Sequence, residues 1–574
     1  MAAPLPKFLP DMSVRWQGCR TGLGIRLVLA CVVCVAWVAC VACLACVVSP
    51  VPAFAGPIIR DIRIDRDPVF TEADRHAVPW LPLGLVNKLH VDTRLRVIRR
   101  ELLFESGQEL DQDLLDESAR KLRNLGVFAD AEILTTAAPG DSVDVVVRTR
   151  ELWTTAVNVA YDRFEDDTLW TVELREKNFL GTAKGFELAR RANPDRDTWV
   201  VGVSDRQMID GTWDGRLRWA NSSDGSAIQW SLRRDYVQLT GNWTVRMGYR
   251  DAQVAPRYYV AEDLYVRPDA RRTAAGFEYG HRLSVSKEGV WRTIAGVEFE
   301  YQNFMNQGPL NLYTPSEELP VSVDFPQDVP EDRRWNTPYV GIERKTRRFV
   351  DLRYLNAMGT REDLALGPEL TLRAGWTARW LGSSTSGFWY TFGHVWKSRL
   401  SRTWLQSVRL NSRGLFGGND GQNLRIVGSI AQYHQPHQWI TMAWGVKAGI
   451  AKEIDRSDVY HLGLNSGLRA ARYRELAGDR LLRGNAELRL IRTSGMLRVL
   501  TPGVVAFTDF GTAWFEDSRD FTWSQVRGAY GVGLRLAFHR ASADVPIRID
   551  LAWPMFYPTE QPSPVISIGT GQIF

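Results

Sequence analysis

The part of the sequence that most restricts the fold begins at Glu151 and extends to the last residue. It contains no uninterrupted apolar run of the about twenty residues that a membrane-spanning helix needs. Instead, segments of about ten residues alternate between apolar and polar positions, for example Gly185–Ala192, Thr212–Ala220 and Trp291–Tyr301. This period of two predicts β-strands with one face in an apolar environment and the other in a polar one.

The distribution of tryptophan indicates which apolar environment this is. Nineteen of the 22 tryptophans lie beyond residue 150, and indole rings favour the two interfaces between lipid and water. A soluble β-sandwich would show similar alternation, but it has no need for so many tryptophans at strand ends. We therefore predict an all-β membrane domain over residues 151–574. It would be a transmembrane antiparallel β-barrel, closed so that every backbone group in lipid is paired.

Residues 1–55 have the pattern of a secretory signal peptide. A positively charged region precedes an apolar stretch from Leu27 to Val48, and Ala53-Phe54-Ala55 before Gly56 is a small-x-small cleavage site. The apolar stretch is also long enough for an uncleaved membrane anchor, and the true start could be Met12.

The cysteines all fall within this N-terminal segment, at Cys19, Cys31, Cys34, Cys40, Cys43 and Cys46. One of the last three could carry a lipid, although the flanking pattern for lipidation is poor. A chain cleaved after Ala55 contains no cysteine and therefore needs no disulfide machinery.

Residues 57–150 predict a small soluble α/β domain. Ile58–Ile64 alternates and predicts a strand, and Thr93–Phe104 has apolar residues at helical spacing. Asp111 or Asp113 can cap a second helix.

A hairpin completes this domain, with strands predicted at Val127–Thr135 and Ser142–Thr149. The order of elements resembles a single POTRA domain, and the stretches at 105–108 and 125–130 are similar to sequence motifs that are usual in that domain. The alternative is an unrelated α/β domain. Such a unit exposes a sheet edge to which an extended client could add a strand. The segment Thr71–His90 goes beyond a minimal domain of this kind.

The last segment, from Tyr460 onward, alternates throughout. The alternation predicts strands at Leu482–Arg492, Pro502–Trp514, Tyr530–His539, Pro546–Trp553 and Pro564–Phe574. The terminal aromatic residue suits a membrane interface.

Two motifs in this segment resemble those of the outer-membrane assembly and translocation family typified by BamA and TamA. The stretch Phe507–Gly511 is similar to the family's Phe-x-Asp-x-Gly strand. Ser567, Gly569 and Phe574 match the pattern of its last strand, from which Gln572 departs.

A loop and a turn extend this resemblance. Gly467–Ala471 is similar to a family loop that normally carries an arginine followed by glycine and an aromatic residue, which Ala470 and Ala471 replace here. Glu176–Lys184 contains Asn-Phe-Leu-Gly-Thr, similar to a turn near the start of the barrel. The resemblance implies a barrel of about sixteen strands, although the alternating segments are somewhat more numerous.

The resemblance also implies a pair of charged residues inside the barrel. Arg469 corresponds to the family's loop arginine, which reaches into the lumen and pairs with the wall, and Asp509 to its strand aspartate. A guanidinium group suits a carboxylate bidentately. The alternative is that Arg469 is a solvated loop residue.

The closure of the barrel is a second point of interest. The first strand, near Thr154, must pair with the last strand, which ends at Phe574. Gly569 and Gly571 weaken this last strand, because glycine adds no packing and frees the backbone. A weak seam could open sideways to admit a client strand; alternatively, the glycines only relieve crowding at closure.

Two stretches interrupt the alternation. Residues 305–337 are rich in proline and acidic residues and predict a loop, which strand parity places at the cell exterior. Residues 353–367 predict another loop or turn.

The sequence lacks several common catalytic and nucleotide-binding motifs. There is no Gly-x-Ser-x-Gly, no His-Glu-x-x-His and no phosphate loop. His434 and His437 lie close together, but a polar turn explains them better than a metal site. The formal net charge of +5 falls to +2 when the net +3 of residues 1–55 is removed, so nucleic-acid binding has no support. We expect no enzymatic activity and no cofactor.

These features together predict an outer-membrane β-barrel of a Gram-negative-type bacterium with one POTRA-like domain in the periplasm. By resemblance, it assists the insertion of outer-membrane proteins or the translocation of polypeptides. Its expected partners are membrane lipids, unfolded clients and an accessory protein of the periplasm. The alternatives are a passive channel and a lipid-transfer barrel that share only the fold.

Overall fold

The computed structural model describes residues 56–77, 79, 82–235, 237–260, 264–305, 309–314, 317–324, 332–353, 355, 358, 361–417, 423–464, 466–491, 500–517, 521–538, 540, 546–557 and 563–570. The predicted signal peptide and the terminal Phe574 lie outside these residues. In the described ranges, no helix is both long and apolar enough to cross a membrane.

The α/β unit predicted over residues 57–150 is present. Its described elements are β1 (Ile58–Asp67), α2 (Glu72–Ala77), α3 (Leu83–Leu89), α4 (Leu95–Arg99), α5 (Gln112–Asn124), β2 (Phe128–Ala138) and β3 (Ser142–Glu151). The central strand of its sheet is β3, which pairs in parallel with β1 and antiparallel with β2. Whether this unit acts as a POTRA domain stays a prediction.

Helix α5 begins as expected, whereas α4 is shorter than the predicted Thr93–Phe104. The side chain of Asp111 accepts hydrogen bonds from the amides of Asp113 and Leu114 and so caps α5. After α4 the chain leaves the helix because Phe104 enters the core. The amide of Leu103 instead donates to the hydroxyl of Ser118 on α5, at 2.9 Å.

The segment 71–90, which the sequence left without interpretation, forms α2 and α3. Asn87 of α3 receives a hydrogen bond from the amide of Phe70 and donates one to its carbonyl, at 3.0 and 2.7 Å. Leu83 packs with Val69 and Phe70, and Trp153 covers this small cluster. The segment is therefore attached to the chain just before the barrel begins.

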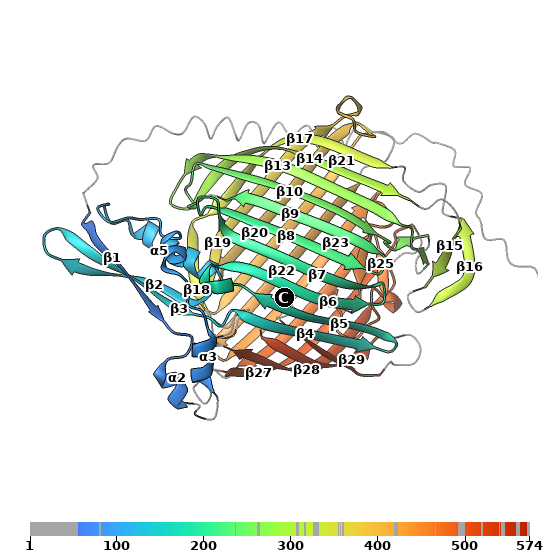
Figure 1. Ribbon diagram of the computed structural model, residues 1–574. Helices are drawn as coiled ribbons and strands as arrows, with labels where there is room; N and C mark the ends of the chain where they lie inside the picture. The colour runs from blue at the N-terminus through green and yellow to red at the C-terminus, as the bar shows by residue number, and fades with distance from the viewer. Residues whose placement is uncertain are drawn as a thin grey trace, which may run out of the picture. The chain divides into compact units, whose positions relative to one another are not determined.

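Most of the remaining described strands close into a barrel (Figure 1). They are β4 (Thr155–Phe164), β5 (Asp167–Glu176), β6 (Lys184–Asn193), β7 (Arg196–Met208), β8 (Trp213–Ser222), β9 (Gly225–Arg234), β10 (Trp243–Val254), β13 (Ala270–Val285), β14 (Gly289–Phe304), β17 (Arg333–Thr346), β18 (Arg348–Leu352), β19 (Glu362–Thr377), β20 (Gly387–Arg399), β21 (Trp404–Phe416), β22 (Leu424–His437), β23 (Ile440–Lys452), β26 (Arg480–Ile491), β27 (Leu500–Trp514), β28 (Arg527–Phe538), β29 (Ile547–Met555) and β30 (Val565–Thr570).

The number of strands exceeds the prediction of about sixteen, which is wrong. Strands β17 and β18 both pair with β19 and together occupy one position in the wall. The described residues therefore form a barrel of twenty strand positions. The smaller number came from the family resemblance. The alternating segments were the better guide, because each crossing of the membrane needs its own segment of about ten residues.

The strands alternate between lipid and lumen. On β7, for example, Trp199 and Val203 are exposed on the outer face, whereas Gly202 faces Glu187 and Arg218 inside. The same pattern places Val340 and Ile566 on the outside. An apolar exterior around a charged interior is the arrangement expected for a barrel in a membrane.

The two ends of the barrel differ. We call the end at which β4 begins the near end, and the opposite end, at which β10 and β14 finish, the far end. At the far end, four short strands form a separate sheet in the order β11 (Tyr258–Tyr259), β12 (Tyr265–Val266), β15 (Pro309–Tyr313) and β16 (Glu318–Asp324). Figure 1 shows β15 and β16 beside this end.

The two predicted loops are thus partly strands. Residues 305–337 contain β15, β16 and the start of β17, so the absence of clear alternation hid a short hairpin. Within 353–367, strand β19 already begins at Glu362. Glu362 and Asp363 suggest a turn in the sequence, but Asp363 is held by Arg123 of α5, whose Nε and Nη2 both lie 2.7 Å from the carboxylate oxygens.

Candidate functional site

The connection between β23 and β26, residues 453–479, folds back into the barrel; we call it the luminal loop. It contains the short strands β24 (Tyr460–Leu462) and β25 (Leu476–Gly478), which pair with each other. Its Leu462 and Leu468 are buried together with Leu481 of β26 and Ala513 of β27. The loop is therefore packed against the inner face of the wall.

Two glycines permit this path. Gly463 has φ +152° and Gly467 has φ +124°, in the region that favours glycine. At Gly467 a Cβ would also collide with the side chain of Arg483. The chain can therefore turn sharply just before Arg469 and direct that side chain at the wall.

Arg469 and Asp509, which the sequence singled out, are brought together by the fold. Arg469 donates from Nε and Nη2 to the two carboxylate oxygens of Asp509, at 2.7 and 2.8 Å. A third hydrogen bond runs from its Nη1 to Glu487, at 2.9 Å. The guanidinium also lies over the ring of Phe507, with Cζ 3.3 Å from the ring centroid. Arg469 is only 4% exposed, so these partners replace its hydration.

Further charged side chains surround this pair. Arg489 donates to Glu487 at 2.8 Å, and Arg535 donates to Asp550 at 2.5 Å. Asn485 donates to Asp509 at 2.7 Å. Sequence reasoning did not assign these residues to the site. The signal was present in the alternation of β26, where Asn485, Glu487 and Arg489 share one face.

The other motif residues have separate places. A Cβ at Gly511 would lie 2.8 Å from Cδ2 of Leu462, so this glycine leaves room for the luminal loop. Gly569 faces Arg548, which forms an ion pair with Asp550, and Phe574 lies outside the described residues.

Ala470 and Ala471, which replace the family's glycine and aromatic residue, are both fully buried. Ala470 packs with Val505 and Phe507, and Ala471 packs with Leu462. Their small side chains allow the loop to approach the wall closely. The aromatic face for Arg469 is supplied by Phe507 of β27.

The barrel closes between its last strand and its first. Strand β30 pairs with β4 only through Ser567 opposite Asp162 and Ile568 opposite Tyr161, within the described residues. By comparison, β4 and β5 are registered through ten residue pairs. We call the junction between β4 and β30 the seam.

The luminal loop is attached on both sides of the seam. On the β4–β5 side, the amide of Tyr473 donates to Asp167 at 2.7 Å, and Arg472 pairs with Glu165. On the other side, Glu475 receives hydrogen bonds from Arg527 of β28 and from Tyr557, at 3.0 Å each. The loop thus bridges the seam from inside the barrel.

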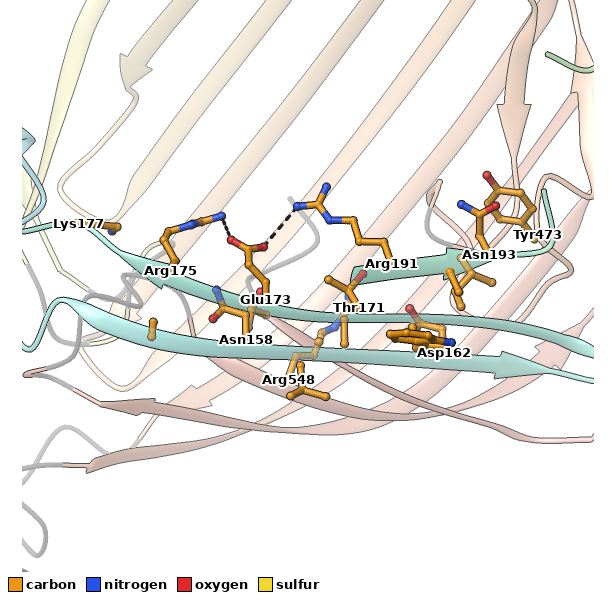
Figure 2. A pocket seen from close by; sticks show the side chains of 18 residues that line it. Asn158, Asp162, Thr171, Glu173, Arg175, Lys177, Arg191, Asn193, Tyr473 and Arg548 are labelled. Carbon is orange, nitrogen blue, oxygen red and sulfur yellow. Dashed lines mark hydrogen bonds and ion pairs between the residues drawn. The ribbon is translucent and has the colours of Figure 1, made fainter. Parts of the chain in front are cut away.

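A cavity of about 580 Å³ adjoins the seam on the inner face of β4, β5 and β6 (Figure 2). Glu173 lies between Arg175 and Arg191 and forms an ion pair with each. Tyr473 of the luminal loop and Arg548 of β29 complete the lining. The cavity is polar and offers both charges and hydrogen-bonding groups beside the first strand.

An aspartate in the turn between β6 and β7 also holds the luminal loop, through Arg474. Asp195 receives hydrogen bonds from Arg257 at 2.9 Å and from Arg474 of the luminal loop at 3.2 Å. Although burial opposes ionisation of Asp195, Arg257 and Arg474 lower its pKa below the usual range. Burial, together with Arg474 and Arg257, lowers the pKa of the neighbouring His461 to about 3.

The rings of the two histidines noted in the sequence each lie beside a tryptophan. The ring of His434 stacks on Trp404, with centroids 4.3 Å apart, whereas His437 lies 5.4 Å from the ring of Trp439. Both residues belong to β22 rather than to a turn, because the strand continues to His437. The described residues contain no cluster of three or more metal-ligating side chains.

Comparison with known protein families assigns a family to the part of the barrel that carries this site. Residues 399–574 match the Omp85 superfamily domain. The C-terminal part of this barrel is an Omp85 superfamily domain. The match includes the luminal loop, Arg469, Asp509 and the last strand, which carry the resemblance to the BamA and TamA family, and it confirms that resemblance. The chain is accordingly an outer-membrane β-barrel protein of a Gram-negative-type bacterium.

Three solved structures show a weak similarity to this chain. BamA from Haemophilus ducreyi lacking POTRA domains 1–3 is 12% identical with a TM-score of 0.38, over 90% of this chain and 85% of that chain. CdiB from Escherichia coli is 13% identical with a TM-score of 0.41, over 92% and 93%. CdiB from Acinetobacter baumannii is 12% identical with a TM-score of 0.40, over 90% and 74%. These identities and TM-scores are low, so the family assignment of residues 399–574 rests on the domain match.

Proposed function

We propose that this chain handles unfolded outer-membrane or secreted polypeptides, and that a client strand engages the barrel at the seam. The observation that carries the proposal is the short registration of β30 with β4, which involves two residue pairs within the described residues. Elsewhere in the wall, neighbouring strands share more pairs, for example fifteen between β13 and β14. Among the described residues, an opening at the seam therefore separates fewer residue pairs than an opening at any other point of the wall.

A backbone hydrogen bond contributes about 0.5–1.5 kcal/mol net to stability, so the two residue pairs that join β30 to β4 within the described residues contribute only a few kcal/mol. A client strand that pairs with the freed edge of β4 restores these bonds through its main chain, largely regardless of its sequence. In lipid this replacement matters, because an unpaired edge is costly.

The luminal loop determines how firmly the seam is held. Arg469 attaches the loop to the wall formed by β26 and β27, and Tyr473 and Arg472 attach it to the β4–β5 hairpin. The loop therefore resists separation of the two sides, and its movement would release them. In this proposal Arg469 holds the luminal loop against the wall and takes no part in a chemical reaction.

The α/β unit offers a first contact for the client. Both β1 and β2 are edge strands of its three-stranded sheet in the described residues. An extended polypeptide can add to either edge by β-augmentation. We propose that the unit lies in the periplasm, where it would present the client to the seam together with an accessory protein.

A disulfide lock of the seam tests this function. A chain that begins at Gly56 has no cysteine, so Tyr161→Cys with Ile568→Cys, which lie opposite each other, introduces a single crosslink. The protein is placed in lipid vesicles and the folding rate of an unfolded barrel protein is measured. We expect acceleration over empty vesicles, its loss when the lock is oxidised, and its return on reduction.

The matched control places the same lock where the wall is already firm. Val159→Cys with Val172→Cys joins β4 to β5, which are fully registered, and should leave the acceleration unchanged. Equal acceleration with the seam locked would contradict the proposed route. Absence of acceleration with several clients, together with a steady ion conductance, would favour the passive channel instead.

A further inference from the structure

A group of apolar side chains is exposed on and near helix α3. Leu85 is 54% exposed, Leu89 is 64% exposed and Val91 is 50% exposed. Leu85 and Leu89 are four residues apart, so they lie on the same face of the helix. Exposed apolar side chains that gather in one place indicate an interaction surface.

The exposed face belongs to a helix that is held firmly on its other side. Leu83 is buried against Val69 and Phe70, and Asn87 forms two hydrogen bonds with the backbone of Phe70. Just after the helix, Glu151 accepts hydrogen bonds from both the amide and the hydroxyl of Thr93, at 3.1 and 2.8 Å. The exposure of Leu85 and Leu89 is therefore a stable property of the fold.

The apolar group continues onto the barrel through the turn between β5 and β6, which contains the short helix η1 (Phe179–Gly181). Phe179 is 56% exposed and Leu180 is 55% exposed. The turn contacts the segment after α3, because the amide of Arg94 donates to the carbonyl of Gly181 at 2.9 Å. A Cβ at Gly181 would collide with the backbone carbonyl of Asp92, so the two segments lie directly against each other.

The turn also continues the lipid-facing surface of the barrel. Leu174 of β5 and Phe186 of β6 are exposed on the outer wall just before and after it. The five residues Leu85, Leu89, Val91, Phe179 and Leu180, which we call the α3 patch, thus extend an interface with lipid that the barrel already has.

The surroundings of the α3 patch are basic. The exposed cations between residues 84 and 100 are Lys88, Arg94, Arg96, Arg99 and Arg100. Five cations against the single carboxylate of Asp92 leave a charge of +4 with histidine neutral. An apolar helix face beside cations is typical of segments that lie in the interface of an anionic membrane.

We propose that the α3 patch lies in the boundary between headgroups and acyl chains of the leaflet at the near end of the barrel. It would anchor the α/β unit to anionic phospholipid beside the first strands. Continuity with the outer wall and the basic surroundings favour lipid over a protein partner. The segment 71–90, which a minimal α/β domain lacks, would then provide a membrane anchor that fixes the unit close to the seam.

Site-specific depth measurement tests this anchor in the full chain from Gly56. A single cysteine, Leu89→Cys or Phe179→Cys, carries a bimane label, and the protein is reconstituted in vesicles of phosphatidylethanolamine and phosphatidylglycerol. Lipids with a doxyl group near the headgroup serve as quenchers. We expect quenching at both positions to be several-fold stronger than at a label on the α/β sheet.

That control label is Leu134→Cys on β2, an apolar residue of similar exposure, 49%, in the same unit. Quenching at Leu89 equal to that at Leu134 would overturn the proposal. Quenching at Phe179 alone would overturn it as well, because only the barrel turn would then reach lipid. Neither result depends on the activity proposed for the seam, so the two proposals can fail separately.

Discussion

The seam and the wall formed by β13 and β14 are built from the same kind of strand, yet they differ in how they are held. Strands β13 and β14 are each 16 residues long and are registered through fifteen residue pairs. Strand β30 has six described residues, and two of them pair with β4. Within the described residues, backbone pairing therefore holds the β13–β14 wall at many more positions than the seam, which the luminal loop bridges as well.

The comparison shows where the barrel can move. A bridge made of a few ion pairs and hydrogen bonds can be released at one point, but a long ladder must be separated along its whole length. We therefore expect substitutions in the luminal loop to act on the seam and to leave β13 and β14 unchanged.

The largest effect is expected from Arg469→Ala. It leaves Asp509 buried without the guanidinium that binds both of its oxygens, and it removes one of the cations beside Glu487, which costs about 3–5 kcal/mol. We expect the luminal loop to detach and become sensitive to protease, and the free energy of unfolding measured in urea to fall. Arg271→Ala, which removes an exposed pair with Asp251, is the control and should change little.

The double charge reversal tests whether the pair acts directly. Arg469→Asp and Asp509→Arg should each impair client folding, and the combination should restore part of it. Failure of the double variant to recover any function would argue against direct pairing as the basis of the effect.

A second effect is expected from acid. The folded pKa of His461 is about 3, below its ordinary 6.5, so the unfolded chain binds a proton first as the pH falls. Stability is thus complete above pH 6.5 and falls by about 1.4 kcal/mol per pH unit below it, until the pH reaches the folded pKa. The lowered pKa of Asp195 adds a loss of the same sign at lower pH.

The variant His461→Phe separates these contributions. Phenylalanine suits the neighbouring ring of Tyr259, which also lies beside Phe515, and it cannot take up a proton. The urea midpoint of the variant should therefore depend less on pH between about 6.5 and 4. An unchanged slope would show that other groups cause the sensitivity to acid.

A smaller effect is expected from Asp167→Ala, which removes the acceptor for the amide of Tyr473. The lost hydrogen bond and the unsatisfied amide cost about 1–3 kcal/mol. Hydrogen exchange should increase in Val565–Thr570 but not in Ala270–Val285. Faster exchange in both strands would mean that the loop supports the whole barrel rather than the seam.

The smallest effect is expected from Gly569→Ala. The added Cβ would lie 3.2 Å from Nη2 of Arg548, a flexible side chain that can move, so the change should stay within about 1 kcal/mol. Gly296→Ala in β14 is the matched variant. There the Cβ would lie 2.5 Å from the backbone oxygen of Phe277, which cannot move aside, and a loss of about 1–3 kcal/mol in urea unfolding is expected.

Much of the candidate site followed from short motifs. The Phe-x-Asp-x-Gly pattern and the loop arginine pointed to Asp509 and Arg469, which the fold brings together. Glu487 and Asp550 were not assigned, because alternation shows only that a charged residue faces the lumen and not which charge it meets. The bridge from Tyr473 to Asp167 joins residues 306 positions apart and has no local signal.

The sequence by itself predicted an outer-membrane barrel after residue 150, because period-two alternation and the absence of long apolar runs are local properties of each strand. Only the tertiary structure decided that the described residues form twenty strand positions and that β30 closes the barrel against β4. It also placed the luminal loop across that seam. These features depend on which strands become neighbours after the chain closes, and such neighbours are far apart in the sequence.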